Sequence, residues 1–240
     1  MNAQIELPSE FILLILGGEI NDIELLLQLA KASSYVICAD GAAELARKHS
    51  IKLSGIVGDL DSISRETLLY YAAIGTTIEH RPDQQTGDFE KSMNCIREKH
   101  GRTHVRILGL DGKRSDHSLS NFSILVRHCN NFRSCVAYDD TSMISVLTQA
   151  NNRMDVSDRP YARISLIPLP AATGVLTTGL KYPITNEDFV FGEREGLSNV
   201  IMGEGTCSIT INSGALLVSL ERPHGPSVTG ESAGERLSDG

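Results

Sequence analysis

Residues 55–62 read G-I-V-G-D-L-D-S, a short apolar run followed at once by two aspartates. The run predicts a short strand over 55–57. Asp59 and Asp61 then follow the end of this strand and can point toward one site outside the sheet. Two like charges this close destabilise a fold that offers no counter-ion, so the pair indicates a cation site.

The alternation of short apolar runs with helical patterns extends through residues 1–139. Strand-like runs lie at 11–16, 35–39, 55–57, 76–79 and 105–110, and several are continuously apolar, as in a sheet covered on both faces. Helices are predicted at 23–32, at 42–49, from a Ser64 cap to Ala73, at 88–99 and at 116–128. The β-α-β order predicts an N-terminal α/β domain with a parallel sheet over residues 1–139.

Residues 140–222 have a different pattern, in which β-rich segments are separated by Gly, Pro and Asn. Strands are predicted at 145–148, 162–169, 174–180, 207–211 and 215–220. This pattern favours a C-terminal antiparallel β-sandwich domain over residues 140–222. Residues 223–240 contain almost no apolar side chains, so we expect a disordered tail.

The composition argues against several classes of function. The formal net charge is −8 and no basic run is present, which argues against nucleic acid or an anionic membrane as a partner. The five cysteines are scattered and lack C-x-x-C spacing, which predicts reduced thiols instead of disulfides or a zinc site. The first residues lack a basic signal-peptide segment, and the apolar run 11–16 is too short to cross a bilayer. We therefore expect a cytoplasmic protein.

Glycines and aspartates gather where the predicted strands end. Asp40-Gly41 follows the second strand, Gly58-Asp59 follows the third, and G-L-D-G at 109–112 follows the fifth. Ligands of open α/β sheets bind outside the carboxyl ends of the strands. These segments are therefore expected to converge on one ligand site.

Two predicted helix starts add further charged residues. Asp88 and Lys91 lie three positions apart on one helix face, and Arg114 and Asp116 lie at the start of another helix. Aspartate is also common at such places because it caps helices and stabilises turns. For each of Asp40, Asp88 and Asp116 taken alone, this structural explanation stays open.

Taken together, the acidic residues suit a metal. Asp59, Asp61 and Asp88 form an oxygen-rich set of the kind that binds Mg²⁺ together with substrate phosphates. Arg114 is a planar, permanently charged group suited to gripping phosphate.

Six blocks of the sequence together resemble the thiamin pyrophosphokinase family, and they occur in the family's order over nearly the whole chain to Leu220. The blocks are A-D-G-A-A (39–43), V-G-D-L-D-S-I (57–63), P-D-Q-Q-T-G-D-F-E-K (82–91), L-G-L-D-G-K-R-S-D-H-S-L-S-N (108–121), G-L-K-Y-P-I (179–184) and R-E-G-L-S-N (194–199).

The resemblance implies a fold and a reaction. The fold is an N-terminal α/β domain followed by a C-terminal β-sandwich, in a homodimer that binds thiamine between the α/β domain of one subunit and the sandwich of the other. The reaction is that of a thiamine diphosphokinase, in which ATP and thiamine give thiamine diphosphate and AMP with Mg²⁺ as cofactor.

The resemblance also implies roles for the acidic residues. Asp59 and Asp61 match the metal-binding pair of the family, Asp88 matches the aspartate that joins them, and Asp40 matches an aspartate near the nucleotide. The proton of the thiamine hydroxyl is expected to pass to Asp88 or Asp116, a choice that the sequence leaves open.

Other polar residues are assigned to the substrates in the same way. Gln84, Arg114 and Asp116 match residues that line the substrate cleft, and Ser198 and Asn199 match the pair that faces thiamine. Arg114, together with Lys91, is expected to stabilise the negative charge that accumulates on the transferred group.

The chain departs from the family pattern at a few positions. Gly87 stands where the family has Thr, Lys113 and Ala42 stand where it has Gly, and the chain has no Trp. These departures keep a non-catalytic thiamine-binding protein as an alternative. A metal-dependent nucleotide-sugar glycosyltransferase is a second alternative, because the D-x-D pair alone suits that chemistry as well.

Overall fold

The computed structural model describes residues 7–203 and 205–222. In the first half of the chain, parallel strands lie in the order β4-β3-β2-β1-β5-β6. These strands are β1 (Ile12–Ile15), β2 (Tyr35–Ala39), β3 (Gly55–Gly58), β4 (Thr77–His80), β5 (His104–Leu108) and β6 (Ser134–Tyr138). The helices between them are α1 (Ile23–Ala32), α2 (Ala42–Lys48), α3 (Arg65–Ala73), α4 (Asp88–His100) and α5 (Ser115–His128), followed by a short 3₁₀ helix, η1 (Cys129–Asn131).

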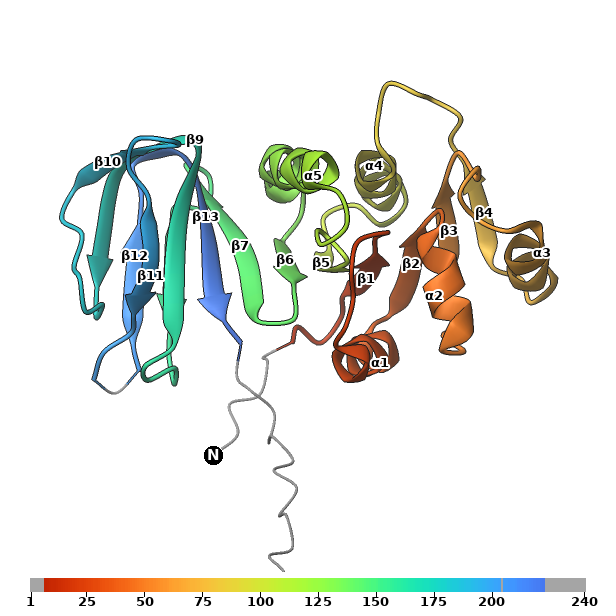
Figure 1. The fold of residues 1–240 in the computed structure, drawn as a ribbon, viewed down its shortest axis with the longest axis horizontal. Coiled ribbons are helices and arrows are strands. Elements are labelled where there is room, and N and C mark those ends of the chain that lie inside the picture. The colour runs from red at the N-terminus through yellow and green to blue at the C-terminus, as the bar shows by residue number, and fades with distance from the viewer. Residues whose placement is uncertain (1–6, 204, 223–240) are drawn as a thin grey trace, which may run out of the picture.

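Alternate residues of β1 enter two separate hydrophobic cores. Ile12 and Leu14 pack with buried residues of α4 and α5, whereas Leu13 and Ile15 pack with those of α1 and α2. Figure 1 shows α4 and α5 on one face of the sheet and α1 and α2 on the other. Because both faces are covered, the strand needs apolar residues at every position, which explains the continuous run at 11–16.

The second half of the chain is antiparallel. Its strands are β7 (Ser142–Thr148), β8 (Arg153–Val156), β9 (Arg163–Thr178), β10 (Glu187–Val190), β11 (Gly196–Val200), β12 (Cys207–Thr210) and β13 (Ser213–Glu221). The long strand β9 pairs with β11 and β13 along its first part and with β10 and β12 along its last part. Fully buried side chains from these strands, including Leu166, Phe189 and Ile209, fill one core between the layers.

The two halves share one continuous sheet. β6, the last parallel strand, pairs antiparallel with β7, and residues 139–141 form the turn between them. The predicted division at 139/140 falls in this turn. None of the helices in the described ranges is long and apolar enough to span a lipid bilayer.

The predicted fold class is confirmed: parallel strands with helices are followed by antiparallel strands. The helix predicted at 23–32 and the strand predicted at 35–39 have the observed bounds. The separate strands predicted at 162–169 and 174–180 are wrong, because they form the single strand β9. The sequence reading also missed β6, β8, β10 and β11. The predicted disordered tail, 223–240, lies outside the described residues.

Candidate active site

The strand order places a topological switch point between β1 and β5. From β1 the chain first adds β2, β3 and β4 on one side of the sheet and then returns to add β5 and β6 on the other. The crevice outside the carboxyl ends of such strands is the usual ligand site of open α/β sheets. A cavity of about 1160 Å³ lies there, lined by the loops after the strands and the starts of α2, α4 and α5. Figure 1 shows the long connection from β4 to α4 extending beyond this end of the sheet.

Three carboxylates meet at this end of the sheet. Asp40 follows β2, Asp59 follows β3 and Asp88 opens α4, and each offers an oxygen within 4.8 Å of the others. Asp40 is only 1% exposed, and its Oδ2 accepts a hydrogen bond from the backbone N–H of Ser62 (3.2 Å). Its Oδ1 is buried and has no hydrogen-bond partner in the described part of the chain. A buried oxygen without a partner beside two further carboxylates fits a bound divalent cation.

The charges of this group are reflected in its acid–base properties. Burial raises the pKa of Asp40 to about 6, and the negative charges of Asp88, Asp59 and Asp61 add to this effect. Burial also raises the pKa of Asp88, although Lys91 opposes the increase. A bound cation would stabilise the ionised form of these carboxylates and lower their pKa values.

Lys91 supplies one cation from within the chain. Its side chain is 4% exposed, and Nζ lies 3.1 Å from Asp59 Oδ2 and 3.4 Å from Asp88 Oδ1. Burial would raise the pKa of Asp59, but hydrogen bonds and charge from Lys91 hold it below its usual value. Gln84 Nε2 donates a further hydrogen bond to Asp59 (3.2 Å). The predicted residues Asp59, Asp88, Lys91 and Gln84 are therefore brought together.

Asp61 lies in the cavity wall but outside the closest group of carboxylates. Ser62 Oγ donates a hydrogen bond to Asp61 Oδ1 (2.8 Å). Leu60, between the two aspartates, has φ 67, so this segment is not the extended one that the i, i+2 spacing suggested. Asp40, which the resemblance placed near the nucleotide, takes the third position beside Asp59 and Asp88. The signal for this arrangement was its place at the end of β2, the neighbour of β3.

Arg114 and Asp116 lie on another side of the cavity, at the start of α5. Arg114 Nη2 lies 2.6 Å from Asp116 Oδ2, and the two side chains are 67% and 64% exposed. The hydrogen bond and charge of Arg114 lower the pKa of Asp116. Both residues are thus free to reorient toward a ligand, but neither touches the three carboxylates through an observed contact.

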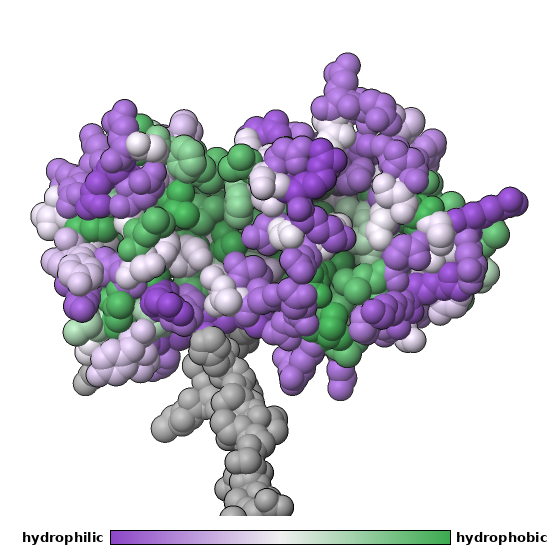
Figure 2. All heavy atoms as spheres, in the orientation of Figure 1, coloured by the Kyte–Doolittle hydropathy of each residue, from purple (hydrophilic) through white to green (hydrophobic). Residues whose placement is uncertain are grey.

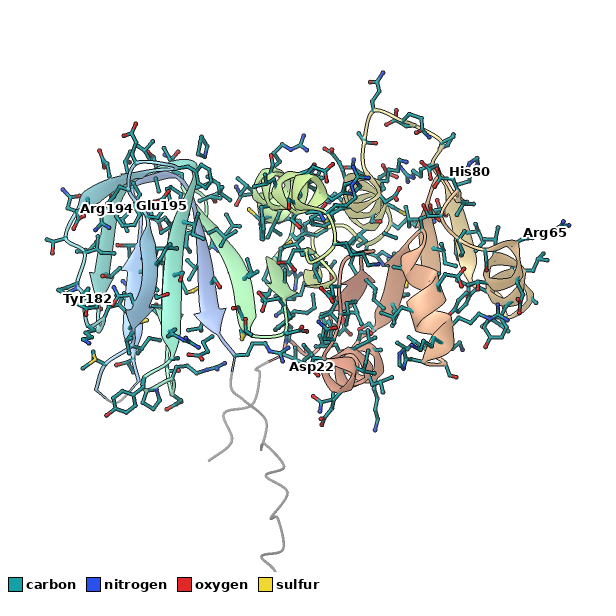
Figure 3. All side chains as sticks on the ribbon, in the orientation of Figure 1. Asp22, Arg65, His80, Tyr182, Arg194 and Glu195 are labelled. Atoms are coloured by element: carbon teal, nitrogen blue, oxygen red, sulfur yellow. The ribbon has the colours of Figure 1, made fainter. Side chains whose placement is uncertain are left out.

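Ser198 and Asn199 do not line this cavity. Asn199 is buried in β11, where its amide accepts a hydrogen bond from the backbone N–H of Tyr182 (3.1 Å) and donates one to the carbonyl of Tyr182 (2.7 Å). Ser198 is exposed and has φ 54. Figure 3 shows Tyr182 at the outer side of the sandwich, far from His80 at the end of β4. One chain alone therefore does not bring this pair to the acidic cavity.

Two features of the cavity were missed from the sequence. Glu44 on α2 accepts hydrogen bonds from the backbone N–H of Ser64 and the hydroxyl of Thr67, both 2.7 Å, and so holds the end of the loop that carries Asp59. The loop after β1 lies against the loop after β5, where a Cβ on Gly18 would be 2.2 Å from the carbonyl oxygen of Asp111. The glycines directly after the first strand were a usable signal for this close approach.

The ligand crevice at the switch point of the sheet and the group of carboxylates in it are features of an enzyme that acts on a phosphate-bearing substrate. Comparison with family models identifies residues 26–138 as the catalytic domain of thiamin pyrophosphokinase and residues 151–216 as its vitamin B1 binding domain. The chain belongs to the thiamin pyrophosphokinase family.

Individual relatives agree with this assignment. Thiamine pyrophosphokinase 3 of Oryza sativa subsp. japonica is 29% identical over 209 residues, which cover 76% of each chain. Thiamine pyrophosphokinase 1 of Arabidopsis thaliana is 28% identical over 204 residues, covering 74% of this chain and 73% of the relative.

Solved structures share the fold. Yeast thiamin pyrophosphokinase aligns with a TM-score of 0.77 at 20% identity, over 90% of this chain and 87% of the yeast chain. Thiamine pyrophosphokinase from Bacillus subtilis aligns with a TM-score of 0.74 at 21% identity, over 89% of this chain and 100% of the other.

Proposed function

We propose that this chain transfers the pyrophosphoryl group of ATP to the hydroxyl of thiamine, giving thiamine diphosphate and AMP. In this reaction the hydroxyl oxygen bonds to the β-phosphorus, the bond between that phosphorus and the oxygen of AMP breaks, and the hydroxyl proton passes to a base. The observation that carries the proposal is the group formed by the buried Asp40 and the partly buried Asp59 and Asp88 beside Lys91, in a cavity at the switch point of the sheet. Family membership supplies the identity of the two substrates.

The three carboxylates are suited to hold Mg²⁺, with Asp61 near enough to add to their negative charge. The ion would neutralise phosphate charge during transfer. Lys91 is already held between Asp59 and Asp88 and keeps the cluster compact. Arg114, at the other side of the cavity, is suited to bind the phosphate chain and the charge that develops on it.

The proton acceptor is proposed to be Asp88 or Asp116. Without a bound cation, burial raises the pKa of Asp88, and the ion pair with Arg114 lowers the pKa of Asp116. A cation held by Asp88 would lower the pKa of Asp88 in turn, so both residues are kept as candidates. Both line the cavity, so the structure supports either in position.

The thiamine site is proposed to be completed by a second copy of the chain, in a homodimer. Support comes from the separation of Ser198 and Asn199 from the acidic cavity, together with apolar side chains exposed on the second half, among them Phe191 (54%) and Leu197 (65%). Figure 2 shows hydrophobic residues on the visible face of the sandwich over β9 and β13, beside α5. Such a surface is suited to an interface between subunits.

The alternatives are less well supported. A pure thiamine binder gains nothing from burying mutually repelling carboxylates such as Asp40 and Asp88, whose pKa values are both raised. A glycosyltransferase leaves the family models over both halves of the chain unexplained. We also propose a cytoplasmic location, supported by five cysteines that are all unpaired.

The proposal is tested by incubating the purified chain with Mg-ATP and thiamine and separating the nucleotides by chromatography. AMP that forms only when thiamine is present, with the β and γ phosphates of ATP both recovered in thiamine diphosphate, is the expected result. ADP with thiamine monophosphate would contradict pyrophosphoryl transfer, and binding of thiamine without turnover would favour the binding protein.

A further inference from the structure

The loop after β1 belongs to the cavity but is anchored from outside it. Gly17, Gly18, Glu19 and Ile20 all line the cavity. On the cavity side the loop is hydrogen-bonded to the loop after β5, where the N–H of Gly18 donates to the carbonyl of Gly109 (2.9 Å) and that of Glu19 donates to the carbonyl of Asp111 (2.7 Å).

The other end of this loop is held by the second half of the chain. Asp140, in the turn between β6 and β7, accepts hydrogen bonds from the backbone N–H groups of Asn21 (3.3 Å) and Asp22 (3.2 Å) at Oδ1. Its Oδ2 accepts a third from the side-chain amide of Asn21 (2.7 Å). Arg222, just after β13, forms an ion pair with Asp22. Figure 3 shows Asp22 between α1 and the lower end of the sandwich.

Asp140 and Arg222, which contact Asn21 and Asp22, are connected to each other through the turn between β6 and β7. Asp139 Oδ1 accepts hydrogen bonds from the backbone N–H groups of Thr141 and Ser142, both 2.6 Å, which fixes the turn that carries Asp140. The N–H of Arg222 donates to the carbonyl of Thr141 (2.7 Å), so the end of β13 is tied to the same turn. Asn21 and Asp22 are therefore bound from the sandwich side by the turn and the end of β13. Asp22 Oδ1 also caps α1 by accepting from the N–H of Leu25 (2.9 Å).

We propose that Asp140 and Arg222 are positioning residues that hold residues 17–20 in the shape that binds the nucleotide, and that they link the sandwich to the cavity through this loop. Neither residue lines the cavity itself. The proposal rests on the proposed function, because it takes the cavity to bind Mg-ATP. It would make a cavity built wholly from the first half of the chain depend on the second half.

Loss of the contacts that Asp140 and Arg222 make with Asn21 and Asp22 is expected to lower the affinity for the nucleotide. A loop that is already in its binding shape does not have to be ordered by the ligand, whereas a released loop lowers the apparent affinity by the fraction of time that it spends in other shapes. The chemistry itself takes place at the carboxylate group and Lys91, which the loop does not contact through an observed bond. The Michaelis constant for ATP should therefore rise while kcat changes little.

The main experiment compares Asp140→Ala and Arg222→Ala with a matched pair of controls. Arg153 and Asp155 form an ion pair of the same type on β8, with the two side chains 58% and 62% exposed, and neither lines the cavity. We expect Asp140→Ala and Arg222→Ala to raise the Michaelis constant for ATP about five- to tenfold, which lies within the range by which single substitutions change the coupling between sites. Asp155→Ala and Arg153→Ala should leave it unchanged.

Hydrogen exchange of the backbone reports on the loop directly. In the two test variants, the amides of residues 17–22 should exchange faster than in the unaltered chain, and in the control variants they should not. This readout does not require turnover. If the unaltered chain forms no AMP, the proposed function fails, and the loop is then judged by exchange together with a calorimetric titration with Mg-ATP.

A reciprocal exchange of side chains protects the test against simple unfolding. Asn21→Asp alone places two carboxylates opposite each other, and Asp140→Asn alone places two amides there. In the double variant N21D/D140N, the amide at position 140 can donate to the carboxylate at position 21, and its oxygen can still accept from the two backbone N–H groups.

The expected outcome is that Asn21→Asp raises the Michaelis constant for ATP and that Asp140→Asn raises it less, because the amide of Asn21 can turn its oxygen toward the new amide. The double variant should return the Michaelis constant to within about twofold of the unaltered value. An unchanged Michaelis constant and unchanged exchange in folded Asp140→Ala would overturn the proposal. It would also be overturned by a double variant that folds but shows the sum of the two single defects, because the contact between the two side chains would then play no part.

Discussion

The acidic cavity and strand β11 use their buried polar side chains in opposite ways. In the cavity, Asp40 leaves its Oδ1 without a partner in the described residues, and neighbouring negative charges help to raise its pKa. In β11, Asn199 uses both ends of its amide: Oδ1 accepts from the N–H groups of Tyr182 and Val200, and Nδ2 donates to the carbonyl of Tyr182. A buried polar group that the fold leaves unsatisfied points to a ligand, whereas a satisfied one points to structure.

The comparison also separates what one chain contains from what it lacks. The group of three carboxylates is assembled from two loops and the start of a helix within a single chain. Of the pair Ser198 and Asn199, only Ser198 is exposed to solvent, and neither residue lines the cavity. The first region can therefore be tested by single substitutions, and the second requires experiments on the assembly.

The largest expected effect is the loss of turnover in Asp59→Asn. The Asp59 carboxylate belongs to the acidic group that is proposed to hold Mg²⁺, and it contacts Lys91. Its removal should therefore weaken the binding of the metal and release the lysine from its position. We expect AMP formation to fall by at least about 100-fold while the fold is retained. Asp155→Asn, on the exposed edge strand β8, is the matched control. Turnover like that of the unaltered chain at saturating Mg²⁺ would remove Asp59 from the site.

The sequence predicts the parallel half of the fold well because each local signal there agrees with the tertiary packing. The apolar runs of buried strands and the Ser64 cap of α3 are fixed by neighbouring residues and by the layers that cover them. In the sandwich, Pro168 and Pro170 suggest a break, but both lie inside β9, opposite a shift in the register of β13 between Gly214 and Leu216. Short strands such as β10 are defined by their partners across the sheet and carry little signal of their own.

The candidate site could be predicted as a set of residues but not as a geometry. The ends of parallel strands meet at one edge, so Asp40, Asp59 and Asp88 were expected to be neighbours. The relative places of Asp40 and Asp61 depend on the left-handed conformation of Leu60, which no spacing rule predicts. The ion pair between Lys91 and Asp59 joins residues that are 32 positions apart, so it too becomes visible only in the folded chain.

A smaller effect is expected on stability in Asp40→Asn, measured without Mg²⁺. Because the pKa of Asp40 is about 6 in the folded chain and lower when unfolded, the folded state binds more protons between these values, and stability falls as the pH rises from about 4 to 7. Asparagine carries no charge, so the variant should be more stable than the unaltered chain by about 3 kcal/mol at pH 8, and the difference should vanish below about pH 3.

Urea unfolding at a series of pH values measures this difference. Addition of Mg²⁺ at pH 8 should stabilise the unaltered chain more than Asp40→Asn, since only the former offers a third carboxylate to the ion. Equal stabilisation of both proteins by Mg²⁺ would place the ion elsewhere and break the contrast drawn with Asn199.

The structural role of Asn199 predicts an effect of about 1–2 kcal/mol. Asn199→Ala removes a buried side chain and leaves the N–H and carbonyl of Tyr182 without their side-chain partner, so the free energy of unfolding should fall by this amount. Ser198→Gly is the informative neighbour, because φ 54 at this position favours glycine and the exposed hydroxyl has no hydrogen-bond partner within the described residues. It should be neutral or slightly stabilising. Equal destabilisation by both substitutions would show that the two residues do not differ as proposed.

The last prediction concerns the shared active site, and its signal is a partial return of activity when two inactive variants are mixed. Asn199 is unsuitable for this test because of its structural role, so the sandwich lesion is Ser198→Trp, which blocks the exposed surface without disturbing the core. Asp59→Asn and Ser198→Trp are each expected to be inactive.

When equal amounts are mixed under conditions that allow subunits to exchange, about half of the dimers contain one chain of each kind. If each site uses the first half of one chain and the sandwich of the other, one of the two sites in such a dimer carries both lesions and the other carries none. Activity should then return to about a quarter of that of the unaltered protein, whereas sites built within single chains would give no recovery. Exchange is verified by tagging one variant and isolating mixed dimers, so that an absence of recovery counts directly against the shared site while leaving the proposed reaction in place.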